Sequence, residues 1–115
     1  MPLKEIRAGD FDNELRSRNS PFVVLFEADW CPFCQSFSPI MERRVDKIPV
    51  PVVRVPLNDD DDQLWDRYSV DVIPTLAVFD GSRIVFRIDG ELGMGLEDAD
   101  VSRLVEYLKS LMSVK

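Results

Sequence analysis

The chain has 115 residues, of which 45% are hydrophobic and 30% charged, a balance typical of a globular domain with a buried core. Its net charge of −7 and scattered basic residues argue against nucleic-acid binding. Its longest apolar run, residues 21–26, is too short to span a membrane, and residues 1–6 lack the apolar core of a signal peptide, so we expect one cytoplasmic domain over residues 1–115.

The first quarter of the chain predicts a short strand, a short helix and a buried strand. Residues 3–6 suit an edge strand. Residues 10–18 have apolar residues on one helical face, with Asp10 as the candidate N-terminal cap, and the segment 19–21 ends that helix. Residues 22–28 are apolar on both faces, which is typical of a strand in the middle of a buried sheet.

A helix, a strand and a second short helix are expected next. Residues 31 to about 46 keep helical apolar spacing, and Pro39 inside this segment should kink the helix. Residues 50–57 suit a strand with prolines at its ends. Residues 58–62, acidic from Asp59 onward, suit a turn, and the apolar residues between positions 64 and 68 suit a short helix.

The last third of the chain predicts a hairpin and a helix. Residues 75–79 and 84–88 suit two strands, because the Asp-Gly pair between them is a strong hairpin signal. Residues 90–95 form a loop. An amphipathic helix follows, with apolar positions from Val101 to Met112. The order is βαβαβα and then ββα, which indicates an α/β fold without repeats.

Two cysteines, Cys31 and Cys34, carry the most specific chemical signal. They are the only cysteines in the chain, and they follow a predicted strand at the start of a predicted helix. The exposed N-terminus of a helix favours a thiolate, because its N–H groups and the positive end of its dipole face the sulfur. Cys34 lies on the same helix face and can close a disulfide with Cys31. The pair predicts a two-electron redox centre.

Metal binding and inert thiols are the alternatives for this pair. A structural zinc site needs four ligands, and the chain has two cysteines and no histidine, so only a dimer that shares four thiolates could build one. The acidic segment 59–62 lacks the ligand spacing, glycine and final glutamate of a calcium loop. We therefore expect no metal at either place. We expect the acidic segment to be a solvated turn that caps the following helix.

The redox pair has further motifs around it, and together they resemble the thioredoxin family over nearly the whole chain. The matching features are Phe26-Glu27-Ala28-Asp29-Trp30-Cys31, Pro39, Tyr68-Ser69-Val70, Ile73-Pro74-Thr75, Asp80-Gly81 and Gly90. The resemblance implies a thioredoxin fold, a central mixed β-sheet of four to five strands flanked by about four helices. It also implies a cis Ile73-Pro74 bond that faces the redox pair.

The resemblance implies a thiol–disulfide oxidoreductase that acts on protein disulfides. Cys31 would attack, and Cys34 would resolve the mixed disulfide. The implied docking surface consists of Trp30, Pro32, Phe33, Ile73, Pro74 and Gly90. Phe33 could be exposed or pack down, and Gly90 could serve loop geometry or substrate approach. No bound cofactor is required, a thioredoxin reductase or glutathione would supply electrons, and we expect a monomer without membrane or nucleic-acid partners.

The chain departs from the family pattern around the redox pair. The buried acid six residues before the first cysteine is replaced by Leu25, and its usual lysine partner by Pro56. The Trp often found at position 27 is Glu27. We expect Glu27 and Asp29 to be solvated acids at the rim of the site.

These departures leave two alternative functions open. Typical thioredoxins carry Gly-Pro between the cysteines, whereas Pro32-Phe33 looks like the Pro-Tyr of glutaredoxins. This favours a glutaredoxin-like or oxidase/isomerase activity as one alternative. Leu25 cannot take a proton, which favours a non-catalytic redox-sensing adaptor as the other.

Overall fold

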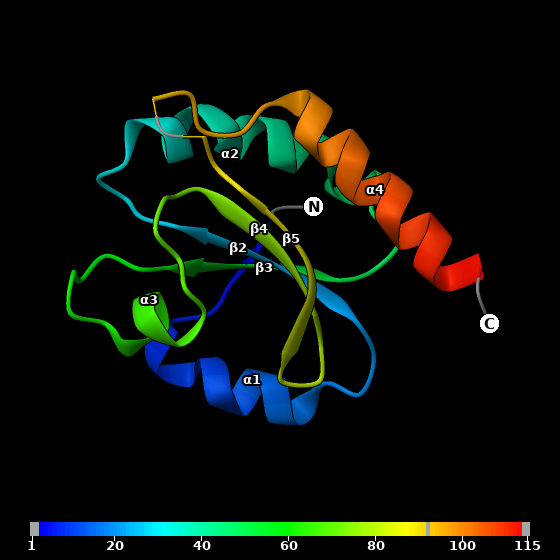
Figure 1. Ribbon diagram of the computed structural model, residues 1–115, viewed down its shortest axis with the longest axis horizontal. Coiled ribbons are helices and arrows are strands. Elements are labelled where there is room, and N and C mark those ends of the chain that lie inside the picture. Colours follow the sequence, from blue (N-terminus) through cyan, green and yellow to red (C-terminus); the bar gives the residue numbers. More distant parts are fainter. Residues whose placement is uncertain (1–2, 92, 114–115) are drawn as a thin grey trace.

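The computed structural model describes residues 3–91 and 93–113, so that residue 92 of the expected 90–95 loop lies outside the described residues. Its strands form one mixed sheet in the order β1-β3-β2-β4-β5 (Figure 1). The strands are β1 (Lys4–Glu5), β2 (Phe22–Glu27), β3 (Val52–Pro56), β4 (Thr75–Asp80) and β5 (Arg83–Asp89). The helices are α1 (Phe11–Ser17), α2 (Pro32–Arg44), α3 (Gln63–Arg67) and α4 (Asp98–Ser113), with 3₁₀ turns at Ala8–Asp10 and Val45–Lys47.

Strand β2 lies at the centre of the sheet. It runs parallel to β3 and antiparallel to β4, and all six of its residues are buried. This confirms the prediction of a strand with two apolar faces. The predicted edge strand is confirmed as β1, which lies at the edge of the sheet and pairs in parallel with β3.

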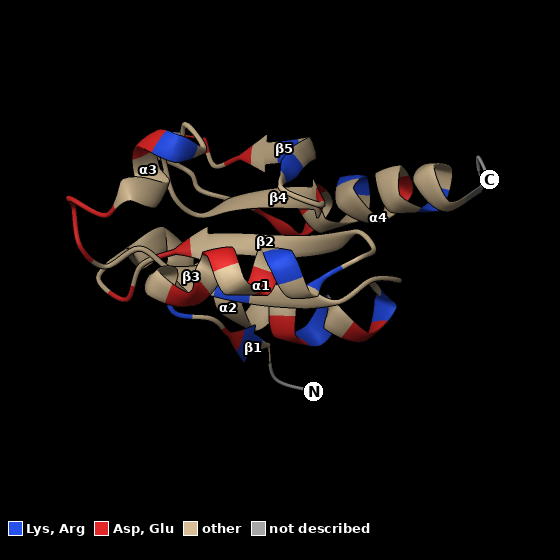
Figure 2. Ribbon diagram, turned by 90° about the horizontal axis from the view of Figure 1, so that it is seen from below, with Lys and Arg blue, Asp and Glu red and all other residues tan. Residues whose placement is uncertain are grey.

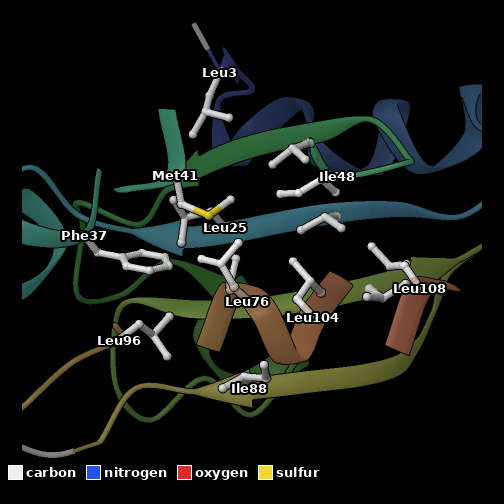
Figure 3. Packing of buried hydrophobic residues seen from close by; sticks show 14 residues of the cluster. Leu3, Leu25, Phe37, Met41, Ile48, Leu76, Ile88, Leu96, Leu104 and Leu108 are labelled. Carbon is white, nitrogen blue, oxygen red and sulfur yellow. The ribbon is translucent and has the colours of Figure 1, made fainter. Parts of the chain in front are cut away.

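Two hydrophobic clusters lie on opposite faces of the sheet, one under α2 and α4 and the other against α1 and α3 (Figure 1). The alternation of side chains along β2 assigns Val23 and Leu25 to the first cluster and Phe22, Val24 and Phe26 to the second. Figure 3 shows the first cluster from close by. The face on which a β2 side chain lies therefore decides which helices it meets.

The prediction that Asp10 caps α1 is wrong. Asp10 occupies the N-cap position, but its side chain makes no capping hydrogen bond and lies 3.6 Å from the Arg7 guanidinium instead. The 3₁₀ turn Ala8–Asp10 leads directly into the helix, which leaves Asp10 with φ −100° and ψ 2° rather than the extended backbone that a capping residue needs. The other expected cap is confirmed: Asp62 Oδ1 accepts the Leu64 N–H at 2.9 Å.

Helix α4 packs through Val101, Leu104 and Leu108, which are fully buried. Met112 was expected on the same apolar face, yet it is 49% exposed. The C-terminal end of α4 extends beyond the sheet (Figure 1), and Met112 there lines an open hollow with Lys47, Pro49 and Lys109 rather than packing into the core. None of the described helices has the length and apolar character needed to cross a membrane.

Candidate active site

The redox pair lies where β2 passes into α2. Cys31 is the N-cap residue of α2, with extended backbone angles, and Pro32 occupies the first helical turn, where a missing N–H costs nothing. The Cys34 backbone N–H points at the Cys31 sulfur, with an N···S distance of 3.3 Å. The predicted placement of Cys31 at a helix N-terminus is therefore confirmed.

Both cysteines are free thiols, and both are largely buried, Cys31 at 4% and Cys34 at 3% exposure. The sulfur of Cys31 was expected to be exposed. It is covered because Ala28 and Ile73 pack against the pair, with the Ile73 carbonyl oxygen 3.8 Å from the Cys31 sulfur. The Ile73-Pro74 bond is cis, as the family resemblance implied.

Trp30 and Phe33 form the exposed apolar rim of the pair, at 55% and 39% exposure. The indole N–H of Trp30 donates to the backbone oxygen of Asn58 at 3.0 Å. The Asn58 side chain in turn accepts the Asp29 N–H at 2.7 Å and donates to the Asp29 carboxylate at 3.0 Å. The sequence analysis did not single out Asn58 as a site residue. Its signal in the sequence was an amide side chain directly after the predicted strand 50–57.

Two glycines allow close packing around the site. A Cβ on Gly90 would lie 2.5 Å from the Pro74 carbonyl oxygen, and Gly90 is not among the glycines with a positive φ, so of the two open explanations the one from loop geometry is not supported. A Cβ on Gly95, which the prediction missed, would lie 2.7 Å from the Cβ of Phe33. Phe33 thus packs against Gly95 while keeping an exposed edge.

Leu25 occupies the position of the family's buried acid and is fully buried. It lies in the apolar cluster with Met41 and Leu76 (Figure 3). No proton acceptor is available at this position.

The prediction that Glu27 is a solvated acid at the rim of the site is wrong. Glu27 is only 6% exposed, whereas Asp29 is solvent-exposed as expected. Glu27 is the last residue of β2 and still pairs with Pro56 in the sheet register. Because the strand stays regular to its end, Glu27 lies on the face of Leu25, towards α2, where the Arg54 Nε is 3.4 Å from its carboxylate.

Burial shifts the titration of two groups at this site. It raises the pKa of the Glu27 carboxyl, and the neighbouring Arg54 guanidinium partly opposes the rise. Burial also raises the pKa of the Cys34 thiol far above its ordinary range, and the hydrogen bond with Cys31 adds to this. The Cys34 thiol is therefore protonated at neutral pH.

The arrangement can form a disulfide between two sulfurs of one helical turn and open it again. Within residues 3–91 and 93–113, no group of three or more His, Cys, Asp or Glu could hold a metal ion. The chemistry that these side chains support is thiol–disulfide exchange.

Comparison with known proteins gives one consistent result. The thioredoxin family model matches residues 2–99. Thioredoxin of Pyropia yezoensis is 27% identical over 109 residues, which cover 94% of this chain and 99% of the relative. Mitochondrial thioredoxin of Mus musculus is 30% identical over 104 residues, which cover 90% of this chain and 58% of the relative.

Solved structures share the same fold. The reduced thioredoxin pre-protein of Schistosoma mansoni superposes with a TM-score of 0.74 at 22% identity, covering 93% of this chain and 98% of that structure. A thioredoxin f2 chain in complex with ferredoxin:thioredoxin reductase gives a TM-score of 0.77 at 15% identity, with 94% and 96% of the two chains covered.

Proposed function

This chain belongs to the thioredoxin family and is a thiol–disulfide oxidoreductase with the redox pair Cys31 and Cys34. We propose that, within its Cys-Pro-Phe-Cys motif, Cys31 attacks the substrate disulfide and Cys34 resolves the resulting mixed disulfide. The observation that carries these roles is the placement of Cys31 as the N-cap of α2, with the Cys34 N–H directed at its sulfur. Such a position stabilises a thiolate, which is the attacking species.

The reaction has two exchange steps. The Cys31 thiolate attacks one sulfur of a substrate disulfide, forms a mixed disulfide and releases the other substrate sulfur as a thiolate. Cys34, once deprotonated, then attacks the Cys31 sulfur and displaces the second substrate thiolate. Two electrons pass to the substrate, which takes up two protons, and Cys31–Cys34 is left as a disulfide.

The docking surface for a protein disulfide consists of the exposed rim and the segment before β4. The proposed members are Trp30, Pro32, Phe33, Ile73, Pro74 and Gly90. The exposure of the Trp30 indole and of one edge of Phe33 supports the assignment of the rim to the docking surface. The short distance from the Ile73 carbonyl oxygen to the Cys31 sulfur supports the assignment of the segment before β4. The tight packing of Gly90 on Pro74 supports a shaping role for Gly90.

A reductase of the thioredoxin-reductase type, or glutathione, would return the pair to its dithiol form. The thioredoxin f2 chain of similar fold is found in complex with ferredoxin:thioredoxin reductase, which supports a protein as the electron donor. We further propose that the protein is a cytoplasmic monomer and that residues 1–115 form one domain. The five strands found in the described part of the chain form a single sheet, which supports one domain. Relatives named as mitochondrial and chloroplastic show that location varies among similar proteins.

An insulin-reduction assay with dithiothreitol tests the proposed function. The wild-type protein should accelerate insulin precipitation, and the Cys31→Ser variant should not. A wild-type protein without activity would support the redox-sensing adaptor instead. Preferential reduction of glutathione mixed disulfides would support the glutaredoxin-like alternative.

A further inference from the structure

A cavity of about 150 Å³ lies behind the redox pair and connects the resolving thiol with a buried carboxyl group. It is lined by Glu27, Ala28, Asp29, Cys34, Gln35, Ser38 and Arg54. The cavity is large enough for water, which needs roughly 10–15 Å³ of probe volume, and the exposed Asp29 and Gln35 in its lining open it to solvent. Cys34 and Glu27 thus line one cavity, while Trp30, Phe33 and Pro74 are not among its lining residues.

Cys34 needs a base to act. Its thiol is 3% exposed, and burial together with the hydrogen bond to Cys31 raises its pKa far above the ordinary value. Only the thiolate attacks a disulfide, so resolution at neutral pH requires a proton acceptor close to Cys34. Leu25, in the family's acid position, cannot accept a proton.

Glu27 is suited to accept this proton. It lies two residues beyond Leu25 on the same face of β2 and lines the cavity with Cys34. Burial raises its pKa above the ordinary value of 4.5, which brings its basicity closer to neutral pH, where a general base works best. The charged groups around it come from four parts of the structure, namely Arg54 on β3, Glu42 on α2, Glu5 on β1 and Asp29 in the redox loop.

Arg54 holds the carboxylate in this place. Its Nε is 3.4 Å from Glu27 Oε2, is buried, and has no hydrogen-bond partner among the described residues. Its Nη2 donates to the Ser38 hydroxyl at 3.0 Å and lies 3.7 Å from the Glu42 carboxylate. The guanidinium is thus fixed from the α2 side, with its positive charge beside Glu27.

We propose that Glu27 accepts the Cys34 proton during resolution of the mixed disulfide, with Arg54 as its positioning residue. The inference rests on the proposed attacker and resolver roles. The proton passes from the Cys34 thiol to the Glu27 carboxylate, directly or through one water in the cavity. The Cys34 thiolate bonds to the Cys31 sulfur, and the bond from Cys31 to the substrate sulfur breaks. The departing thiolate takes a proton from solvent, and Glu27 returns its proton to solvent.

The two exchange steps can be timed separately with a chromogenic aromatic disulfide. Attack by Cys31 releases one coloured thiolate, and resolution by Cys34 releases a second. In Glu27→Gln the second phase should slow by about tenfold or more at pH 7, because general-base catalysis typically contributes 10²–10⁴-fold. The first phase should stay within about twofold of wild type.

The pH profile distinguishes a proton acceptor from a structural role. The wild-type resolution rate should show an inflection at the raised Glu27 pKa, and Glu27→Gln should lose it. Glu42→Gln is the matched control, because it removes a carboxylate beside the same arginine but outside the cavity lining. It should retain both phases and the inflection.

Resolution at the wild-type rate and with the wild-type pH profile in Glu27→Gln would overturn the inference. A first phase that is absent from the wild type, or that survives in Cys31→Ser, would instead overturn the proposed function. If Glu27→Gln does not fold, NMR titration of the Glu27 carboxyl carbon in the wild type tests whether Glu27 is the proton acceptor. The inference expects a raised pKa that differs between dithiol and disulfide forms, and identical titrations in both forms would contradict it.

Discussion

At the scale of single residues, the two sulfurs differ in their surroundings although both are buried. The Cys31 sulfur accepts an N–H at the start of α2, whereas Cys34 lies within the helix, where burial raises its thiol pKa. The difference between attacker and resolver is therefore one of hydrogen bonding and desolvation rather than of exposed area.

This difference predicts selective alkylation. Brief treatment of the reduced protein with iodoacetamide at pH 7 should label Cys31 several times faster than Cys34, because only a thiolate reacts readily. Peptide mapping by mass spectrometry measures the ratio. Faster labelling of Cys34 would reverse the assigned roles.

The buried Glu27 predicts a pH-dependent contribution to stability. Its pKa is raised in the folded state, while an unfolded glutamate titrates near the ordinary value of 4.5. Below that pH its contribution to folding is fully present, and it is lost as the pH rises through the folded pKa, because the folded state then holds a proton that the unfolded chain releases.

The free energy of unfolding of the wild type minus that of Glu27→Gln should therefore fall as the pH rises from about 4 through the folded pKa. Urea unfolding of both proteins at a series of pH values measures this difference. A difference that grows with pH over the same window would show that the Glu27 pKa is lowered, not raised.

At the scale of elements, the site depends on how closely three segments meet. The cis Ile73-Pro74 segment leads into β4, Gly90 directly follows β5, and the start of α2 carries the cysteines. The Pro74 carbonyl leaves no room for a side chain at Gly90, so the end of β5 fixes the backbone that faces Cys31.

Gly90→Ala should destabilise the fold by about 1–3 kcal/mol, as expected when a methyl group is forced into tightly packed backbone. It should also slow attack by Cys31, because the Pro74 carbonyl has to move. Gly9→Ala is the matched control, since a Cβ there meets nothing within 4 Å, and its stability should change by less than about 0.5 kcal/mol. Denaturant unfolding compares the two, and equal stabilities would refute the packing role of Gly90.

At the scale of the whole molecule, the net charge of −7 is concentrated in part beside the site. The loop between β3 and α3 carries a run of exposed acids, Asp59 to Asp61, next to Trp30 (Figure 2). Such a surface attracts cationic partners and repels anionic ones over about a Debye length.

A peptide disulfide flanked by lysines should therefore be reduced about tenfold faster at low salt than the same peptide flanked by glutamates. The ratio should shrink towards one at 1 M salt. The double variant Asp60→Asn and Asp61→Asn should reduce the preference without affecting the intrinsic exchange. A preference that does not respond to salt would rule out steering by charge.

The sequence predicted the order of the elements and the position of the redox pair, because both depend on local patterns. The burial of Glu27 could not be predicted, since it depends on β2 remaining regular to its last residue and on Arg54 arriving from β3. Asn58 and Gly95 were missed for a related reason, because their contacts join segments far apart in the chain. Long-range packing, rather than local propensity, completes the site.

Trapping of mixed disulfides separates the attacking cysteine from the resolving one. Cys34→Ser and Cys31→Ser are each incubated with one protein disulfide substrate, quenched with acid and separated on a non-reducing gel. We expect a stable mixed disulfide with Cys34→Ser, since no thiol remains to resolve it, and almost none with Cys31→Ser. Equal trapping by both variants, or trapping by Cys31→Ser alone, would contradict these roles.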